Sequence, residues 1–191
     1  MENPKLQAPG KGLPLVESLV ARFYYGPIVS KKFTAEQNWK RFEKTNQKIL
    51  DLTKNISDEK IHQKVLVPRL PAIEDSSRYW SVAETLEHIE IVGDSIASGI
   101  EMLLRNEVPT KKVNIAEYKP KGKYNDLDPR PPFLQFSKRT TERLKHQNIT
   151  LAKPYYHHPW MGNFSALQWL WLLAGHSGIH LNQIMHIKSK L

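Results

Sequence analysis

The sequence predicts an all-α fold, a four-helix bundle with long connections and a short accessory helix near its N-terminal end. Three observations support this. Apolar residues recur at helical spacing in four stretches, capping motifs mark the start of three of them, and no stretch shows a convincing strand pattern. With 191 residues, 40% of them hydrophobic, the chain can bury a core. Helices that each carry an apolar stripe are expected to pack those stripes together, as in a bundle.

We expect residues 1–33 to form a lead-in with the accessory helix, and residues 34–191 to form the bundle. Pro14 suits the first turn of the accessory helix, and Gly26-Pro27 ends that helix. Charged residues interrupt the apolar side chains of this region, so it does not resemble a secretory signal. The sequence therefore predicts a cytoplasmic protein.

The long helices have recognisable starts. The motifs Thr34-Ala-Glu-Gln37, Ser81-Val-Ala-Glu84 and Ser165-Ala-Leu-Gln168 each place a hydroxyl three residues before a carboxyl or amide group, which is the pattern of a capping box. The third of the four helices is expected to begin near Pro131-Pro132, because proline favours the first helical turn. Before it lies a long basic connection, residues 110–130, which is rich in lysine and proline and is expected to rim a site.

Polar residues interrupt the apolar face of the last predicted helix. At 3.6 residues per turn, this face reads Trp169, Leu173, His176, His180, Gln183 and Ile187. Buried polar groups must be satisfied by one another, by water or by a bound ion. Because His176 and His180 lie one turn apart, both imidazoles can reach one metal ion. This spacing predicts a metal site inside the bundle.

A third ligand is available on the second helix, where His88 lies at the margin of the apolar stripe. The chain has no cysteine, which leaves histidine and carboxylates as the good metal ligands and excludes a thiolate nucleophile. A zincin mechanism requires glutamate directly after the first histidine of the pair, whereas Ser177 and Gly178 follow His176 here. Nucleophile-elbow, phosphate-loop and dinucleotide-binding motifs are also missing.

These residues resemble the DinB-like, YfiT-related family of four-helix bundle proteins. The matching elements are Trp80-Ser81 followed by Glu84, Leu86 and His88, then His158-Pro-Trp-Met-Gly162, then His176-x-x-x-His180-x-x-Gln183. The resemblance covers roughly residues 34–188. In that family three histidines typically hold a divalent metal such as zinc or nickel, and by motif match these would be His88, His176 and His180. The resemblance also implies a homodimer and a low-molecular-weight thiol cosubstrate.

Two hypotheses of function follow. Three neutral imidazoles leave an open position on the ion, where it can activate a water for hydrolysis of a small molecule or a thiol for transfer to one. The resemblance favours the second route, a metal-dependent transferase of the thiol-dependent S-transferase type, over a hydrolase. The alternative is a non-catalytic metal- or ligand-binding stress-response bundle protein, because no general base stands out in the sequence. Gln183 either contacts a metal-bound ligand or substrate, orients a histidine, or only bonds a neighbouring segment.

Other notable residues have simpler interpretations. The capping box already accounts for Glu84. His157 and His158 are interpreted as structural or pocket-rim groups, and Trp80, Trp160 and Trp169 as packing elements more than pocket walls.

The net charge of +9 is spread over several helix faces, which argues against nucleic acid as a partner and favours a mild attraction for anions. No apolar run is long enough to predict a membrane span.

Overall fold

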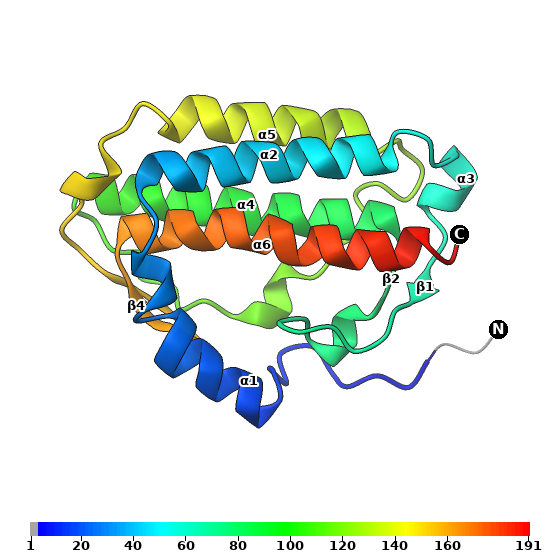
Figure 1. Cartoon of the computed structure of the whole chain (residues 1–191), viewed down its shortest axis with the longest axis horizontal. Coiled ribbons are helices and arrows are strands. Elements are labelled where there is room, and N and C mark those ends of the chain that lie inside the picture. The colour runs from blue at the N-terminus through cyan, green and yellow to red at the C-terminus, as the bar shows by residue number, and fades with distance from the viewer. Residues whose placement is uncertain (1–3) are drawn as a thin grey trace.

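The computed structural model describes residues 4–191, and its four long helices confirm the all-α four-helix bundle. These helices are α2 (Ala35–Thr53), α4 (Val82–Leu104), α5 (Arg130–Leu144) and α6 (Ala166–Lys188), and they run side by side (Figure 1). Helix α6 packs against α2 and α4, and α5 packs against the same two helices. The apolar stripes of all four helices therefore face one shared core.

The predicted helix starts are formed as expected. Helices α2, α4 and α6 each begin with a complete capping box, in which the N-cap side chain and the side chain three residues later bond each other's backbone N–H groups. At the start of α6 the rings of Phe164 and Trp169 meet edge to face, with centroids 5.6 Å apart. This contact is a hydrophobic staple, and it fixes the direction in which the chain enters α6.

The core between α4 and α5 depends on a glycine. Gly93 lies on α4, and a Cβ atom added to it would stand 2.3 Å from Cζ of Phe136 on α5. Phe136 is fully buried and also meets Phe42 of α2 at a ring-centroid distance of 6.1 Å. The missing side chain at residue 93 therefore lets a phenylalanine fill the centre of the bundle.

Short elements that the sequence did not predict occupy the connections. One antiparallel pair joins β1 (Val65–Leu66) to β2 (Tyr79–Trp80), and another joins β3 (Tyr156–His158) to β4 (Gly162–Phe164). The other short elements are α3 (Asp58–Ile61), η3 (Asp75–Ser77), η4 (Ile115–Tyr118) and η5 (Ile149–Leu151). Elements of two to four residues are too short for hydrophobic periodicity to reveal them. The two strand pairs nevertheless lead directly into α4 and α6 and so position the starts of these helices.

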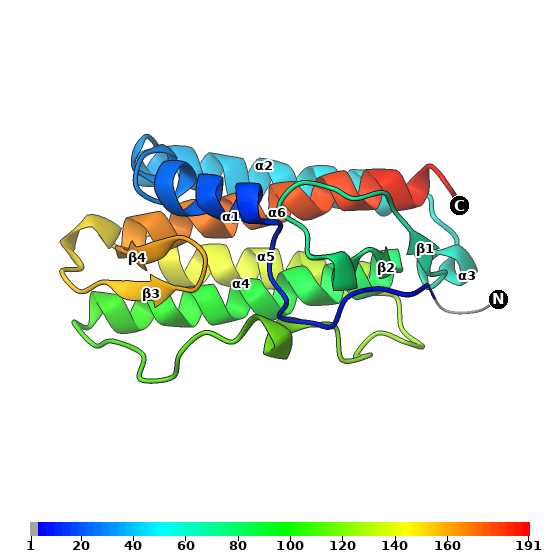
Figure 2. The ribbon, with the colours of Figure 1, turned by 90° about the horizontal axis from the view of Figure 1, so that it is seen from below.

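The N-terminal segment lies across the bundle. Its elements are α1 (Leu15–Val20), the π-helix η1 (Ala21–Tyr25) and the 3₁₀ turn η2 (Val29–Lys31), in the region where the sequence predicts the accessory helix. Figure 2 shows this segment on the same side of the bundle as the β3–β4 hairpin. The carboxylate of Glu74 accepts hydrogen bonds from the backbone N–H groups of Gly10 and Gly12, at 3.4 and 2.9 Å. Partly buried hydrogen bonds thus attach the lead-in to the body of the protein.

None of the helices within residues 4–191 is long and apolar enough to cross a membrane.

Candidate metal centre

Three imidazoles meet between α4 and α6. His88 comes from α4 and His176 and His180 come from α6, and one ring nitrogen of each lies within 4.8 Å of those of the other two. The Nε2 atoms of His88 and His176 are 3.2 Å apart. Two nitrogens bound to one tetrahedral zinc ion at about 2.0–2.1 Å lie roughly 3.3 Å from each other. The structure therefore brings the three predicted residues into an arrangement that could hold a metal ion.

The orientation of the His88 ring is fixed by the backbone of the long connection. Its Nδ1 atom is 2.6 Å from the carbonyl oxygen of Tyr118, the last residue of η4. A carbonyl oxygen can only accept, so Nδ1 must carry the proton and donate it. Nε2 then keeps its lone pair and faces the other histidines, which is the form that can bind a metal. No motif or spacing in the sequence indicates this contact.

Gln183 fixes the orientation of His180 in a similar way. The amide nitrogen of Gln183 donates to the backbone carbonyl of Ser77 at 2.7 Å, so its oxygen must face the other way, toward Nδ1 of His180 at 2.8 Å. His180 therefore donates from Nδ1 and keeps a lone pair on Nε2. Gln183 therefore contacts both a histidine of the cluster and a neighbouring segment, and its side chain is fully buried.

Burial keeps the three imidazoles neutral. Loss of solvation, with repulsion from the charged form of His180, lowers the pKa of His88 well below its ordinary value. The same two causes lower the pKa of His176 well below that value, and burial lowers the pKa of His180 to about 4. Only neutral imidazole binds a metal, so the site is in its binding form at neutral pH. The ring of Trp80 packs on His88 and His180, at centroid distances of 5.0 and 6.2 Å.

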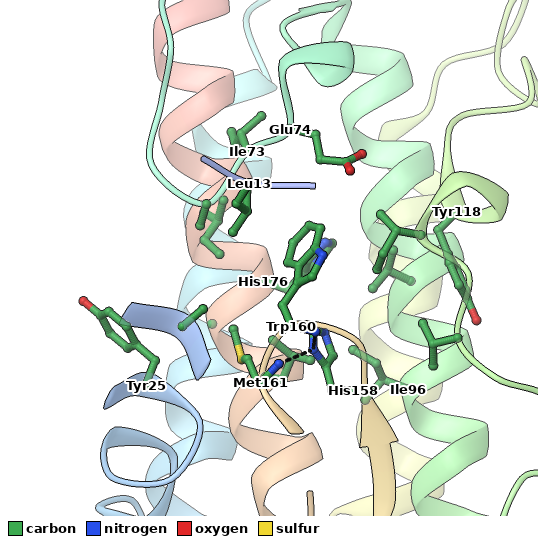
Figure 3. A pocket seen from close by; sticks show the side chains of 18 of the residues that line it. Leu13, Tyr25, Ile73, Glu74, Ile96, Tyr118, His158, Trp160, Met161 and His176 are labelled. Atoms are coloured by element: carbon green, nitrogen blue, oxygen red, sulfur yellow. Dashed lines mark hydrogen bonds between the residues drawn. The ribbon is translucent and has the colours of Figure 1, made fainter. Parts of the chain in front are cut away.

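A cavity of about 630 Å³ adjoins the cluster. It is lined by all three histidines, by residues of the N-terminal segment and by Val113, Ile115, Tyr118 and Lys119 of the long connection, as expected for a connection that rims a site. Figure 3 shows Tyr25 and Tyr118 on opposite sides of the cavity in that view. Trp160 and Trp169 line the cavity, which differs from their interpretation as packing elements more than pocket walls. Trp80 is not part of this lining and packs on the ring of His88.

His158 lies in the cavity wall but outside the metal cluster. Its Nδ1 accepts hydrogen bonds from the backbone N–H groups of Trp160 and Met161, at 3.2 and 3.3 Å (Figure 3). Nε2 must therefore carry the ring proton. Burial, with repulsion from His157, lowers the pKa of His158 to about 3. The structure agrees with its interpretation as a pocket group, while His157 contacts Asn163 on the exposed side of the hairpin.

An ion pair that no motif or spacing in the sequence indicates lies beside the histidines. Nζ of Lys119 lies 2.6 Å from Glu74 and 2.8 Å from Oγ of Ser77, and stands over the ring of Trp80. Burial alone would raise the pKa of Glu74, but Lys119 and the N–H groups that Glu74 accepts outweigh it, and this pKa lies below its ordinary value. Both partners come from irregular segments, where residue spacing carries no information on contacts.

Comparisons with known proteins support the fold. TT2238, a solved protein described as a four-helix bundle protein, superimposes with a TM-score of 0.55 over 80% of this chain and 98% of its own chain, at 19% sequence identity. At this identity the likeness shows the fold alone. No protein-family model and no curated protein matches the sequence, so the comparisons do not establish the DinB-like family for this chain.

Proposed function

We propose that this chain binds a divalent metal ion, zinc or nickel, through the Nε2 atoms of His88, His176 and His180. The observation that carries the proposal is the convergence of three neutral imidazoles, two of which are held with Nδ1 protonated by acceptors outside the cluster. The donor set fits either ion, because imidazole suits both zinc and nickel. Residues 34–191 would then form a DinB-like bundle domain, with residues 1–33 as its accessory segment.

The activity that this site supports best is that of a metal-dependent transferase of the thiol-dependent type, or of a hydrolase. When bound, the ion would supply a Lewis acid that lowers the pKa of a water or a thiol in its open position. Neutral histidines leave the ion's charge uncompensated, so they favour an anionic ligand there. The apolar wall around the cluster limits the access of water, and Nε2–H of His158 is a hydrogen-bond donor in the same wall. The resemblance to DinB-like proteins favours the transferase, with a low-molecular-weight thiol as cosubstrate.

A non-catalytic metal- or ligand-binding protein is the second candidate. It is favoured because, among residues 4–191, no available base lies beside the cluster. Among the residues that line the cavity, the carboxylates are Glu17 and Glu74, and each forms an ion pair, with Arg69 and Lys119 respectively. The predicted homodimer and cytoplasmic location stay predictions.

The test begins with metal content. Protein purified without a histidine tag is analysed by mass spectrometry, together with His176→Ala and the matched control His186→Ala, which removes a histidine of α6 outside the cluster. We expect one ion per chain in the wild type and the control, and none in His176→Ala. Wild-type protein that takes up no zinc or nickel would overturn the proposal.

The second stage is a conjugation assay with a thiol and an electrophile, and a hydrolysis assay with activated esters. Turnover that requires the ion and is lost in His176→Ala supports the enzyme. A full complement of metal without turnover over a broad substrate panel would favour the binding protein.

A further inference from the structure

The cavity beside the candidate metal centre has walls made predominantly of carbon. Its wall on the N-terminal side includes Leu13, Val16 and Val20, and the bundle contributes Ile96 of α4 and Ile179 of α6. Aromatic rings complete it, among them those of the indole residues Trp160, Trp169 and Trp171. Such walls offer dispersion contacts and few hydrogen bonds, so they suit the apolar part of a ligand.

The size of the cavity fits an organic molecule. Its volume of about 630 Å³ lies within the range of about 300–1,000 Å³ that is typical of small-molecule sites. Ordered water is stable in a cavity only where each molecule finds two to four polar partners. An apolar wall of this extent does not supply them, so displacement of water by an apolar group is favourable.

Charge is distributed unevenly around the cavity. An ion held by His88, His176 and His180 would bring its full positive charge to the cavity, because imidazole ligands supply no negative charge to compensate it. The carboxylates of Glu74 and Glu17 are neutralised by Lys119 and Arg69, at 2.6 and 2.7 Å, so neither repels an anion. The polar end of a ligand is therefore expected to be anionic and to lie at the histidines.

From these observations we infer that the cavity binds an amphiphile, a molecule with one anionic, metal-binding head and an apolar body that lies beneath the N-terminal segment. The head group of this ligand rests on the proposed function, because it needs the ion. The apolar body rests on the cavity walls alone. Molecules of this kind would be the substrates of the proposed enzyme. Residues 13–25, which precede the bundle, would select them by contact with their apolar part.

The probe is a series of straight-chain carboxylates from butanoate to decanoate, titrated into the zinc-loaded protein by calorimetry. We expect affinity to rise about fourfold for each added methylene, which is the effect of burying that group. Carboxylates of equal length with an ethylene-glycol chain should show no such rise. Equal affinities along the alkyl series would overturn the inference.

Two neighbouring residues of α1 provide matched variants. Val20 lines the cavity and Leu19 does not, although both are partly exposed, at 41% and 47%. Val20→Asp should weaken decanoate binding by about tenfold or more, because a charge would lie against the alkyl chain. Leu19→Asp should bind decanoate like the wild type. Equal effects of the two substitutions would contradict the assignment of the wall.

The His176→Ala variant separates this inference from the proposed function. Without the ion the head group loses its partner, but the rise of affinity with chain length should persist, because the walls are intact. If wild-type protein takes up no metal and yet shows the chain-length effect, the proposed function fails and the apolar site stands. If metal binds and chain length has no effect, the apolar site fails and the metal proposal stands.

Discussion

Gln183 accepts a hydrogen bond from Nδ1 of His180 at 2.8 Å, and this contact determines which nitrogen of that imidazole is free. The amide can face His180 in only one way, because its nitrogen donates to the carbonyl of Ser77. A side chain one turn beyond a candidate ligand thus holds the ligand in its binding form. Tyr118 acts on His88 through its backbone carbonyl, which no substitution of the side chain removes.

Substitution of Gln183 is expected to weaken metal binding. Gln183→Leu removes the acceptor for Nδ1 of His180 and leaves the carbonyl of Ser77 unpaired, while keeping a similar volume. Loss of such a partner of a metal-binding histidine typically lowers metal affinity about 10–100-fold. Competition with a chelator of known affinity measures the change. The control is Asn182→Ala, an exposed position of the same helix, and an unchanged affinity in Gln183→Leu would contradict this role.

His158 should make the stability of the metal-free protein depend on pH. Its pKa is about 3 in the folded protein, against about 6.5 for an unperturbed histidine. Between these values the unfolded chain binds more protons, so the free energy of unfolding falls as the pH falls from 6.5 toward 3. The contribution of this residue over that window is a few kcal/mol.

We expect His158→Gln to lose stability less steeply than the wild type as the pH falls below 6.5. The measurement is urea unfolding at several pH values in the presence of a chelator. His157→Gln is the matched control, since His157 is the exposed neighbour in the same strand. Parallel profiles of wild type and His158→Gln would show that residue 158 is not buried in neutral form.

The close approach of α4 and α5 predicts opposite effects for two glycine substitutions on one helix. Gly93→Ala places a Cβ against the ring of Phe136 and should destabilise the protein by about 1–3 kcal/mol, the usual cost of overpacking. At Gly99 a Cβ would meet nothing within 4 Å, and Gly99→Ala should stabilise by roughly 0.5–1 kcal/mol through helix propensity. Urea denaturation measures both changes in the free energy of unfolding. Changes of the same sign in the two variants would contradict this account.

The pair of Lys119 and Glu74 should be sensitive to the loss of one partner. Their side chains are only 16% and 3% exposed, so Lys119→Met leaves a buried carboxylate without its cation. We expect a loss of roughly 3 kcal/mol in the free energy of unfolding at pH 7. The double variant Glu74→Gln with Lys119→Met should recover part of it. A double variant less stable than Lys119→Met alone would show that Glu74 stabilises the fold mainly through Gly10 and Gly12.

Much of the candidate site was predictable because its signals are local. The capping boxes at Thr34, Ser81 and Ser165 lie within single turns, and the spacing of His176 and His180 places both on one helix face. Each of these patterns describes a single helix, whose start and faces are determined by residues only a few positions apart. Its place on a helix and the family resemblance made His88 a candidate ligand. No residue spacing in the sequence predicts how far it lies from His176 and His180.

The sequence by itself determined where the four long helices begin and which of their faces are apolar or carry imidazoles, because helical periodicity and capping are short-range. Only the tertiary structure decided that the carbonyl of Tyr118 reaches His88 and that of Ser77 reaches Gln183. It also decided that Lys119 pairs with Glu74 and that the N-terminal segment closes one wall of the cavity. These contacts join residues 30 to 106 positions apart. They depend on the paths of irregular connections, which no repeating pattern in the sequence describes.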